Sequence, residues 1–151
     1  MPYYICPNCK KRSVDIDAVE GFSHKSELQC RSCGFGFLFE LMDDYYPAPT
    51  TGFVVCDANA RVLATGRDVF QLSGFQESDL LGRDLIETLS LVPVEDGEHP
   101  AKVALEWGVR KLGEHMEIRT RSGRQQKVTA DFFPAYDEDG GLLVALTPRS
   151  G

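Results

Sequence analysis

The spacing of apolar residues along the chain predicts two parts of different character. In residues 1–42, apolar and polar positions alternate over short runs, as in half-buried strands, and the last run places Phe35, Phe37 and Phe39 on one face. Strands are expected over residues 12–18, 25–29 and 35–41. Residues 43–50 combine acids with two prolines, so we expect a linker there.

Residues 51–148 contain longer apolar runs separated by turn signals, and they predict a mixed α+β domain. Asp84 is a candidate helix N-cap, and Pro100 suits the first turn of a helix that runs to about Leu112. The expected strands cover residues 52–56, 61–64, 114–121, 126–133 and 142–146. The expected helical segments cover residues 67–72, 76–81, 85–89 and 100–112.

Composition limits the cellular setting. Hydrophobic residues make up 42% of the chain, enough for a core, and no apolar run reaches the roughly 18 residues of a membrane span. The N-terminal residues lack the apolar segment of a signal peptide. We therefore expect a cytoplasmic protein without membrane contact. The net charge of −7 and the pI of about 4.9 argue against a general nucleic-acid binder.

Four of the five cysteines form two C-x-x-C pairs, Cys6 with Cys9 and Cys30 with Cys33. One tight turn can aim two thiolates at the same ion, so two such turns supply the tetrahedral four-sulfur shell that zinc accepts. We predict a structural zinc ion (Zn2+) held by these four cysteines. Such a closed shell leaves no position for substrate, so no catalysis is expected from the metal.

Two other interpretations of the cysteine pairs are weaker. A thioredoxin-like redox pair belongs in a βαβ context, which the pattern does not predict, and an iron–sulfur cluster fits the surrounding short hairpins less well than zinc does. His24 lies between the pairs and is expected to be an exposed loop residue, because four cysteines already complete the shell. Cys56 lies in a predicted strand and is most simply a small buried residue.

Residues 4–41 resemble a zinc ribbon, and residues 51–148 resemble the PAS family. The second resemblance rests on the order and spacing of short motifs. These are residues 52–57 (GFVVCD), 59–63 (NARVL), 72–75 (LSGF), 79–85 (DLLGRDL), 117–123 (EIRTRSG) and 136–140 (YDEDG). The PAS resemblance implies a five-stranded antiparallel sheet with short helices on one face, a small cavity between them, and a role in sensing or protein contact.

The chain departs from the PAS pattern in places that bear on function. Thr65 stands where the family often has asparagine, and residues 145–148 lack the Asp-x-Thr that leads into an output helix. Light-sensing members attach flavin to a cysteine in an Asn-Cys-Arg-Phe run, which the sequence lacks. Haem-binding members use a histidine on or near the long helix, where we expect His99 and His115 to be surface or capping residues and Trp107 to lie in the core or at its rim. We therefore predict neither flavin nor haem.

No catalytic constellation is recognisable in the sequence. It has no Gly-rich phosphate loop and no Ser-His-Asp set with suggestive spacing. The acids of one predicted turn, Asp137, Glu138 and Asp139, are expected to be solvated. A basic run on the predicted hairpin consists of Arg119, Arg121, Arg124 and Lys127. Alternation predicts that this run forms one exposed face paired with acids across strands, and partner binding is the alternative.

These observations favour a non-enzymatic signalling or regulatory module, bacterial in character, that acts through protein–protein contact, with a small ligand as an optional second input. We expect a homodimer, because the aromatic strand at residues 35–41 offers more apolar surface than one small ribbon can cover. The alternative function is nucleic-acid binding by the ribbon. Its footprint would be Lys10, Lys11, Arg12 and Lys25, with Tyr3 or Tyr4 to stack on bases.

Overall fold

The computed structural model describes residues 50–66, 68–94, 98–134 and 141–149, together with the backbone of three short N-terminal strands. The chain separates into two compact units, Met1–Pro47 and Ala48–Gly151.

The N-terminal unit contains a small antiparallel sheet in which β1 lies between β2 and β3. The strands are β1 (Tyr3–Ile5), β2 (Arg12–Ser13) and β3 (Phe39–Leu41). Ile5 pairs with Arg12 on one side and with Phe39 on the other. β2 and β3 fall within two predicted strands, and the pattern does not predict β1. The strand predicted over residues 25–29 lies outside the described residues.

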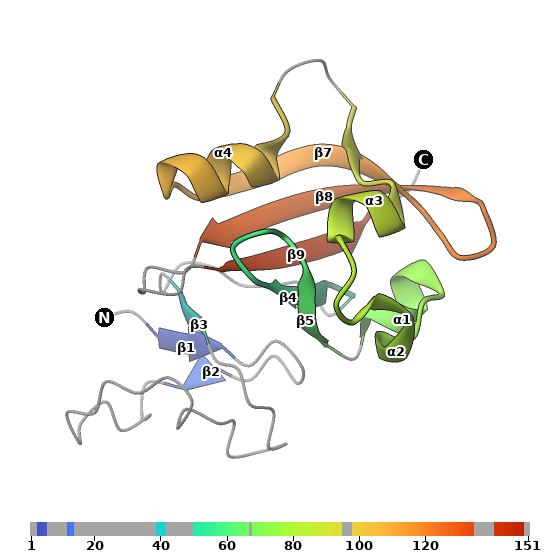
Figure 1. Cartoon of the computed structure of the whole chain (residues 1–151), viewed down its shortest axis with the longest axis horizontal. Helices are drawn as coiled ribbons and strands as arrows, with labels where there is room; N and C mark the ends of the chain where they lie inside the picture. The colour runs from blue at the N-terminus through green and yellow to red at the C-terminus, as the bar shows by residue number, and fades with distance from the viewer. Residues whose placement is uncertain are drawn as a thin grey trace. The chain divides into compact units, whose positions relative to one another are not determined.

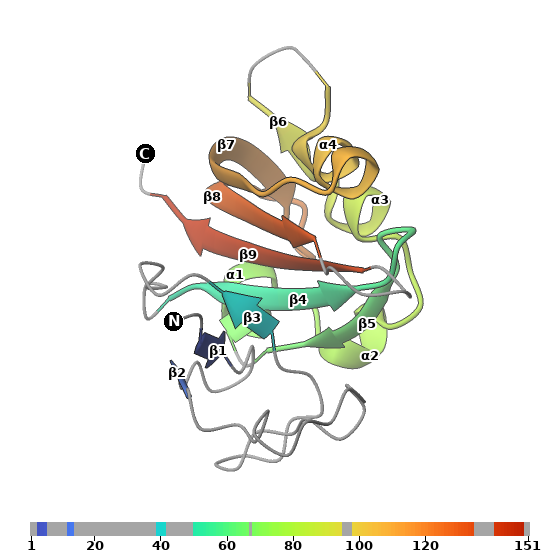
Figure 2. The same ribbon diagram turned by 90° about the vertical axis from the view of Figure 1, so that its left-hand side faces the viewer.

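The C-terminal unit is built on a six-stranded antiparallel sheet with the order β5-β4-β9-β8-β7-β6 (Figure 1; β6 is labelled in Figure 2). The strands are β4 (Gly52–Cys56), β5 (Val62–Thr65), β6 (Val92–Pro93), β7 (Lys111–Arg119), β8 (Gln125–Pro134) and β9 (Leu142–Pro148). The first and last long strands, β4 and β9, are neighbours, with Phe53 opposite Ala145. The two ends of this unit therefore meet in the middle of its sheet.

The sheet has one strand more than the predicted five. The extra strand, β6, pairs Val92 with Glu117 and Pro93 with Met116 of β7, and the Val94 N–H donates to the His115 carbonyl at 3.0 Å. The expected strands do not include this segment, because two residues, one of them proline, carry no alternating pattern. Proline is tolerated here because β6 is an edge strand.

Short helices cover one face of the sheet (Figure 2). They are α1 (Asp68–Ser73), α2 (Glu77–Leu80), α3 (Leu85–Leu89) and α4 (Pro100–Trp107). A continuous cluster of buried apolar side chains fills the space between these helices and the sheet. The sheet contributes residues such as Met116 and Phe132, and the helices contribute residues such as Leu80 and Leu89. Burying each of these side chains stabilises the unit by roughly 1.5–3 kcal/mol relative to exposure.

The helix boundaries follow from local capping. The Asp84 side chain accepts the Glu87 N–H at 3.1 Å and begins α3, as the sequence predicts. α4 ends at Trp107, short of the predicted Leu112, because Gly108 adopts the left-handed conformation with φ 63° and its N–H caps the Ala104 carbonyl. Residues 111–112 belong to β7 instead.

The opposite face of the sheet is apolar over its central strands. Its buried residues are Phe53 and Val55 on β4, Phe133 on β8, and Leu143 and Ala145 on β9. β4 and β9 are therefore nearly continuous apolar runs in the sequence, as strands buried on both faces are. Toward the β7–β8 turn, the same face becomes polar and exposed.

Candidate functional site

A shallow hollow of about 490 Å³ lies between the end of α1 and the turn that joins β7 to β8. Residues 71–74 line one side, and residues 120–122 and 124 line the other. We call this the α1–hairpin hollow. It brings together two segments that are about fifty residues apart in the sequence, and no local pattern predicts their meeting.

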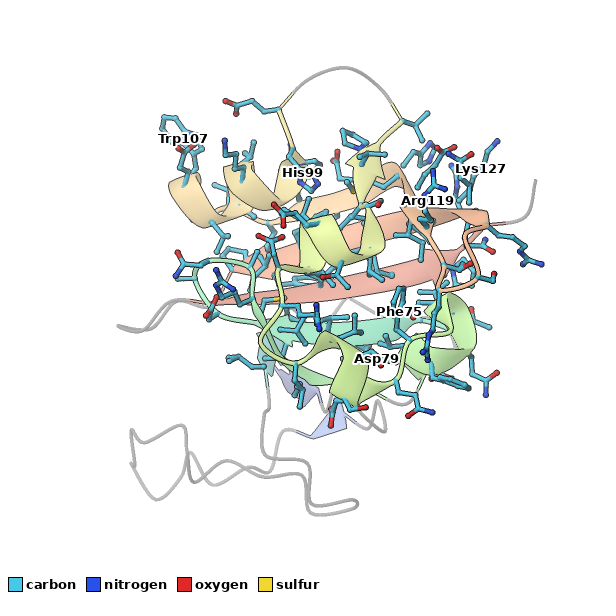
Figure 3. The ribbon with its side chains drawn as sticks, turned by 45° about the vertical axis from the view of Figure 1, so that its right-hand side comes forward. Phe75, Asp79, His99, Trp107, Arg119 and Lys127 are labelled. Carbon is cyan, nitrogen blue, oxygen red and sulfur yellow. The ribbon has the colours of Figure 1, made fainter. Side chains whose placement is uncertain are left out.

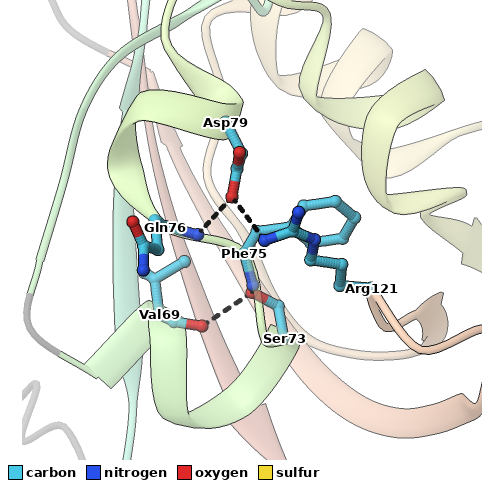
Figure 4. Close-up of polar contacts among 6 residues, drawn as sticks. All are labelled: Val69, Ser73, Phe75, Gln76, Asp79 and Arg121. Carbon is cyan, nitrogen blue, oxygen red and sulfur yellow. Dashed lines mark hydrogen bonds and ion pairs between the residues drawn. The ribbon is translucent and has the colours of Figure 1, made fainter.

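Backbone contacts hold the two sides of the hollow together. The Arg121 N–H donates to the Ser73 carbonyl at 2.8 Å. Gly74 follows with φ 79°, and a Cβ atom at this position would lie 3.4 Å from the Cβ of Arg121. Glycine suits this position because the backbone is left-handed, whereas a Cβ atom at 3.4 Å would be in ordinary contact. The Ser73 hydroxyl donates to the Val69 carbonyl at 2.7 Å and accepts the Phe75 N–H at 3.2 Å, which fixes the chain that leaves the helix (Figure 4).

An ion pair adds a second link, between the turn and α2. Arg121 Nη1 lies 3.3 Å from Asp79 Oδ2, and the same oxygen accepts the Gln76 N–H at 2.9 Å (Figure 4). The Arg121 side chain is 61% exposed and the Asp79 side chain 33% exposed. Water and salt screen such a pair, so it contributes only about 0.2–1 kcal/mol. Asp79 follows Gln76 by the three residues of a helix-capping pair, but its partner across 42 residues leaves no signal in the sequence.

The hollow presents hydrogen-bond donors of the kind that bind anions. Arg121 and Arg124 are among its lining residues, and so are Thr120 and Ser122, whose hydroxyls lie 3.0 Å apart. Within the described part of the chain, no carboxylate pairs with Arg124. Guanidinium groups match carboxylates and phosphates in geometry. The lining has no histidine, cysteine or carboxylate, so this arrangement suits binding rather than proton transfer.

The basic run does not form the single face that was predicted. Arg119 and Lys127 lie on the outer side of the strands, because their neighbours Ile118 and Val128 are buried on the inner side. Both are labelled near the hairpin end of the sheet in Figure 3. Lys127 stands opposite Glu117, as cross-strand pairing with acids requires. Arg121 and Arg124 lie instead in the turn and line the hollow, because β7 ends at Arg119.

Cys56 is buried on β4 as part of the apolar cluster. Burial, together with the nearby carboxylates of Asp57 and Asp84, raises the pKa of its thiol from 9.0 to about 12. The group is therefore a neutral thiol at physiological pH, consistent with the predicted role of a small apolar residue.

His99 is a capping residue, as expected. Its Nδ1 accepts the Ala101 N–H at 3.1 Å at the start of α4, and its Nε2 lies 2.9 Å from the Leu91 carbonyl. The ring stands edge-on to Phe132 with 6.3 Å between centroids. Both ring nitrogens are engaged, so neither is available to an iron ion in this arrangement.

The other two residues considered as cofactor contacts are His115 and Trp107, and both are exposed. His115 is exposed on the outer side of β7, next to the buried Met116. Trp107 is 73% exposed at the end of α4, which corrects the expectation of a core or rim position (Figure 3). Trp107 is the last residue of α4, and the buried residues of this helix are Pro100, Ala101 and Ala104. The absence of flavin and haem stays a prediction.

Thr65, the departure from the PAS pattern, ties β5 to α2. Its N–H and its hydroxyl both donate to Glu77 Oε2, at 2.9 and 3.2 Å. Thr65 thus donates two hydrogen bonds to the carboxylate of Glu77, the first residue of α2.

The predicted zinc ligands Cys6, Cys9, Cys30 and Cys33 lie outside the described residues, as do His24 and the acidic turn at residues 137–139. Across the described ranges, no group of histidine, cysteine and carboxylate side chains could hold a metal ion. The zinc site therefore stays a prediction.

No protein-family model matches the sequence, and no match to it was found among curated proteins. Solved structures do match. The PAS domain of an HTR-like protein from Haloarcula marismortui is 18% identical with a TM-score of 0.53, covering 68% of this chain and 88% of that one. The PAS domain of nitrogen regulation protein NR(II) from Vibrio parahaemolyticus is 13% identical with a TM-score of 0.53, covering 67% and 91%. The light-state dimer of the fungal blue-light photoreceptor Vivid is 10% identical with a TM-score of 0.56, covering 70% and 82%.

These likenesses confirm the predicted PAS fold of the chain's larger part, apart from the additional strand β6. At such low identity they concern the fold alone. The described helices include none with the length and apolar character required to cross a membrane.

Proposed function

We propose that this protein is a non-enzymatic regulatory module of signal transduction or transcription control, in which a PAS-type unit contacts a partner protein and a zinc ribbon precedes it. The observation that carries the proposal is the PAS fold of residues 50–149, shared with the PAS domains of nitrogen regulation protein NR(II) and of a two-component sensor histidine kinase. The site chemistry agrees with it, because the α1–hairpin hollow offers binding groups without a general base.

The last strand supports contact by surfaces rather than through a helix that follows the sheet. β9 continues to Pro148, and the next residue, Arg149, donates its N–H to the Lys127 carbonyl at 2.8 Å. The Thr51 and Thr147 hydroxyls lie 2.7 Å apart and join the first strand to the last. Pro148 would disfavour a helix at this point. Signals are therefore expected to pass through faces of the unit.

Contact with a partner protein is favoured over a ligand held between the helices and the sheet. A continuous apolar cluster occupies the space between helices and sheet, where PAS-type units can hold a small molecule. A small ligand remains a second input. The zinc ion is assigned a structural role, because four thiolates close its shell.

The proposal is tested by identifying the partner and rebuilding the complex. The tagged protein would be cross-linked in its own host, and each enriched protein would be purified and titrated against the pure chain by calorimetry. We expect at least one saturable complex of defined stoichiometry. If every candidate fails to bind and the pure chain instead turns over a substrate, the proposal is wrong.

A further inference from the structure

We propose that the α1–hairpin hollow is the docking site for an acidic side chain presented by a segment of the partner protein. This inference rests on the proposed function and names the surface and the chemistry of the contact. The residues that carry it are Arg121 and Arg124, together with Thr120 and Ser122.

The charge of the hollow is opposite to that of the molecule. The chain carries a net charge of −7, yet the exposed groups around the β7–β8 turn are mainly cations. The described carboxylate paired with Arg121 belongs to Asp79, and Arg124 has none among the described residues. At physiological salt, charges more than about 8 Å apart are largely screened, so this local set of cations decides what binds here.

Arg121 can turn toward a ligand without disturbing the fold. Its contact with Asp79 is long, 3.3 Å, and exposed. Asp79 keeps its hydrogen bond from the Gln76 N–H when Arg121 leaves, so the start of α2 stays capped. The backbone of Arg121 stays bonded to Ser73 whichever way the guanidinium points. Arg121 can therefore exchange the carboxylate of Asp79 for a carboxylate of the partner.

The hollow fits a protein segment better than a free small anion. Its arginines are exposed, and each exposed ion pair contributes little to affinity. A ligand held only by them would bind weakly, so it needs contacts beyond the hollow. Phe70 of α1 offers one: its carbonyl accepts the Gly74 N–H at 2.8 Å, and its side chain is 49% exposed. A segment with an acidic residue beside an apolar one matches both features.

The experiment is a nuclear magnetic resonance titration of the full-length, zinc-supplied protein. The probe is a short synthetic peptide of alternating Glu and Phe residues, and its match has Gln in place of Glu. Inorganic phosphate is a separate arm. We expect saturable shifts of the Gly74, Thr120 and Ser122 amides with the Glu peptide, and weaker ones with the Gln peptide and with phosphate.

Two variants remove the same charge from the same hairpin. Arg124→Ala removes a cation from the hollow, and Lys127→Ala removes one from the outer face of the sheet, opposite Glu117. We expect Arg124→Ala to weaken binding of the Glu peptide by about two- to fivefold, and Lys127→Ala to change it by less than about 1.5-fold. Phe70→Ala should also weaken binding of the Glu peptide and leave phosphate binding unchanged.

Three results would overturn the proposal. The first is an equal loss of affinity in Arg124→Ala and Lys127→Ala, which would indicate unspecific charge attraction. The second is the absence of a saturable shift at the hollow. The third is phosphate binding as tightly as the peptide, which would indicate a small-anion site. A partner complex that forms equally well with wild type and Arg124→Ala would defeat this site but leave the proposed function standing. Absence of any partner complex with wild type would defeat the function itself.

Discussion

Cys56 illustrates how one position on a strand acquires its chemistry from its surroundings. In sequence it is a single cysteine outside the two C-x-x-C pairs. In the structure its side chain joins the apolar cluster, with the carboxylates of Asp57 and Asp84 nearby, and its pKa rises to about 12. Nothing at this position resembles the low-pKa thiol that reactive cysteines need.

The raised pKa predicts how Cys56 contributes to stability at high pH. Above pH 9 the unfolded chain releases this proton, whereas the folded chain keeps it until about pH 12. The unfolded state then binds fewer protons, so the free energy of unfolding falls as pH rises, by at most about 1.4 kcal/mol per pH unit from this group. Urea unfolding of wild type and Cys56→Ala at increasing pH measures it. The variant should lack this part of the decline, and parallel curves would contradict the assignment.

At the scale of single elements, the capping residues decide where the short helices begin. α4 has only two turns, so its first hydrogen bonds matter to its stability. His99 supplies an acceptor to Ala101 and also contacts the Leu91 carbonyl, which links the helix to the end of α3. Pro100 follows at the first helical position, where a missing N–H costs nothing.

Replacing His99 should separate its two roles. His99→Ala removes the cap and the contact to Leu91, and we expect a loss of about 1–2 kcal/mol in the free energy of unfolding. His99→Asn keeps a capping oxygen but is too short to reach Leu91, so it should recover part of the loss. Chemical denaturation of the three proteins gives the comparison. Equal stability of wild type and His99→Ala would refute the capping role.

At the scale of the whole molecule, the two units are expected to depend on different sources of stability. The C-terminal unit has an extended apolar cluster of its own. The three described strands of the N-terminal unit are two or three residues long, so they bury little surface and need a cross-link such as a metal ion.

We predict one zinc ion per chain, bound by Cys6, Cys9, Cys30 and Cys33. Replacing Cys30 with Ser should abolish zinc retention and unfold the N-terminal unit, because binding free energy of a structural zinc ion is folding free energy. Resonances of the C-terminal unit, such as the Gly108 and Gly123 amides, should remain dispersed. Elemental analysis measures the metal; iron in place of zinc, or a metal-free folded chain, would defeat the prediction.

We also predict a homodimer. β3 is an edge strand of the N-terminal sheet and belongs to the aromatic run at residues 35–41. An exposed strand edge is a template for pairing, and a symmetric dimer is the commonest way to cover it. Light scattering over a range of concentrations should give twice the 16.8 kDa of one chain. A mass of one chain throughout would exclude it.

Sequence reasoning predicted the C-terminal fold well because its signals are local. Continuous apolar runs marked β4 and β9, Asp84 marked the start of α3, and the order of elements pointed to a PAS-type sheet. Two boundaries were not predicted. Gly108 ends α4 before Leu112, and the two residues of β6 are too few to show a period.

The sequence by itself determined the order of strands and helices, the apolar faces and the paired cysteines, since each depends on residues a few positions apart. Only the tertiary structure decided the α1–hairpin hollow. The pairing of Arg121 with Asp79 and Ser73 depends on how β7 and β8 pack against α1 and α2. It also divided the basic run between two faces, because where β7 ends is set by strand pairing and not by the charges themselves.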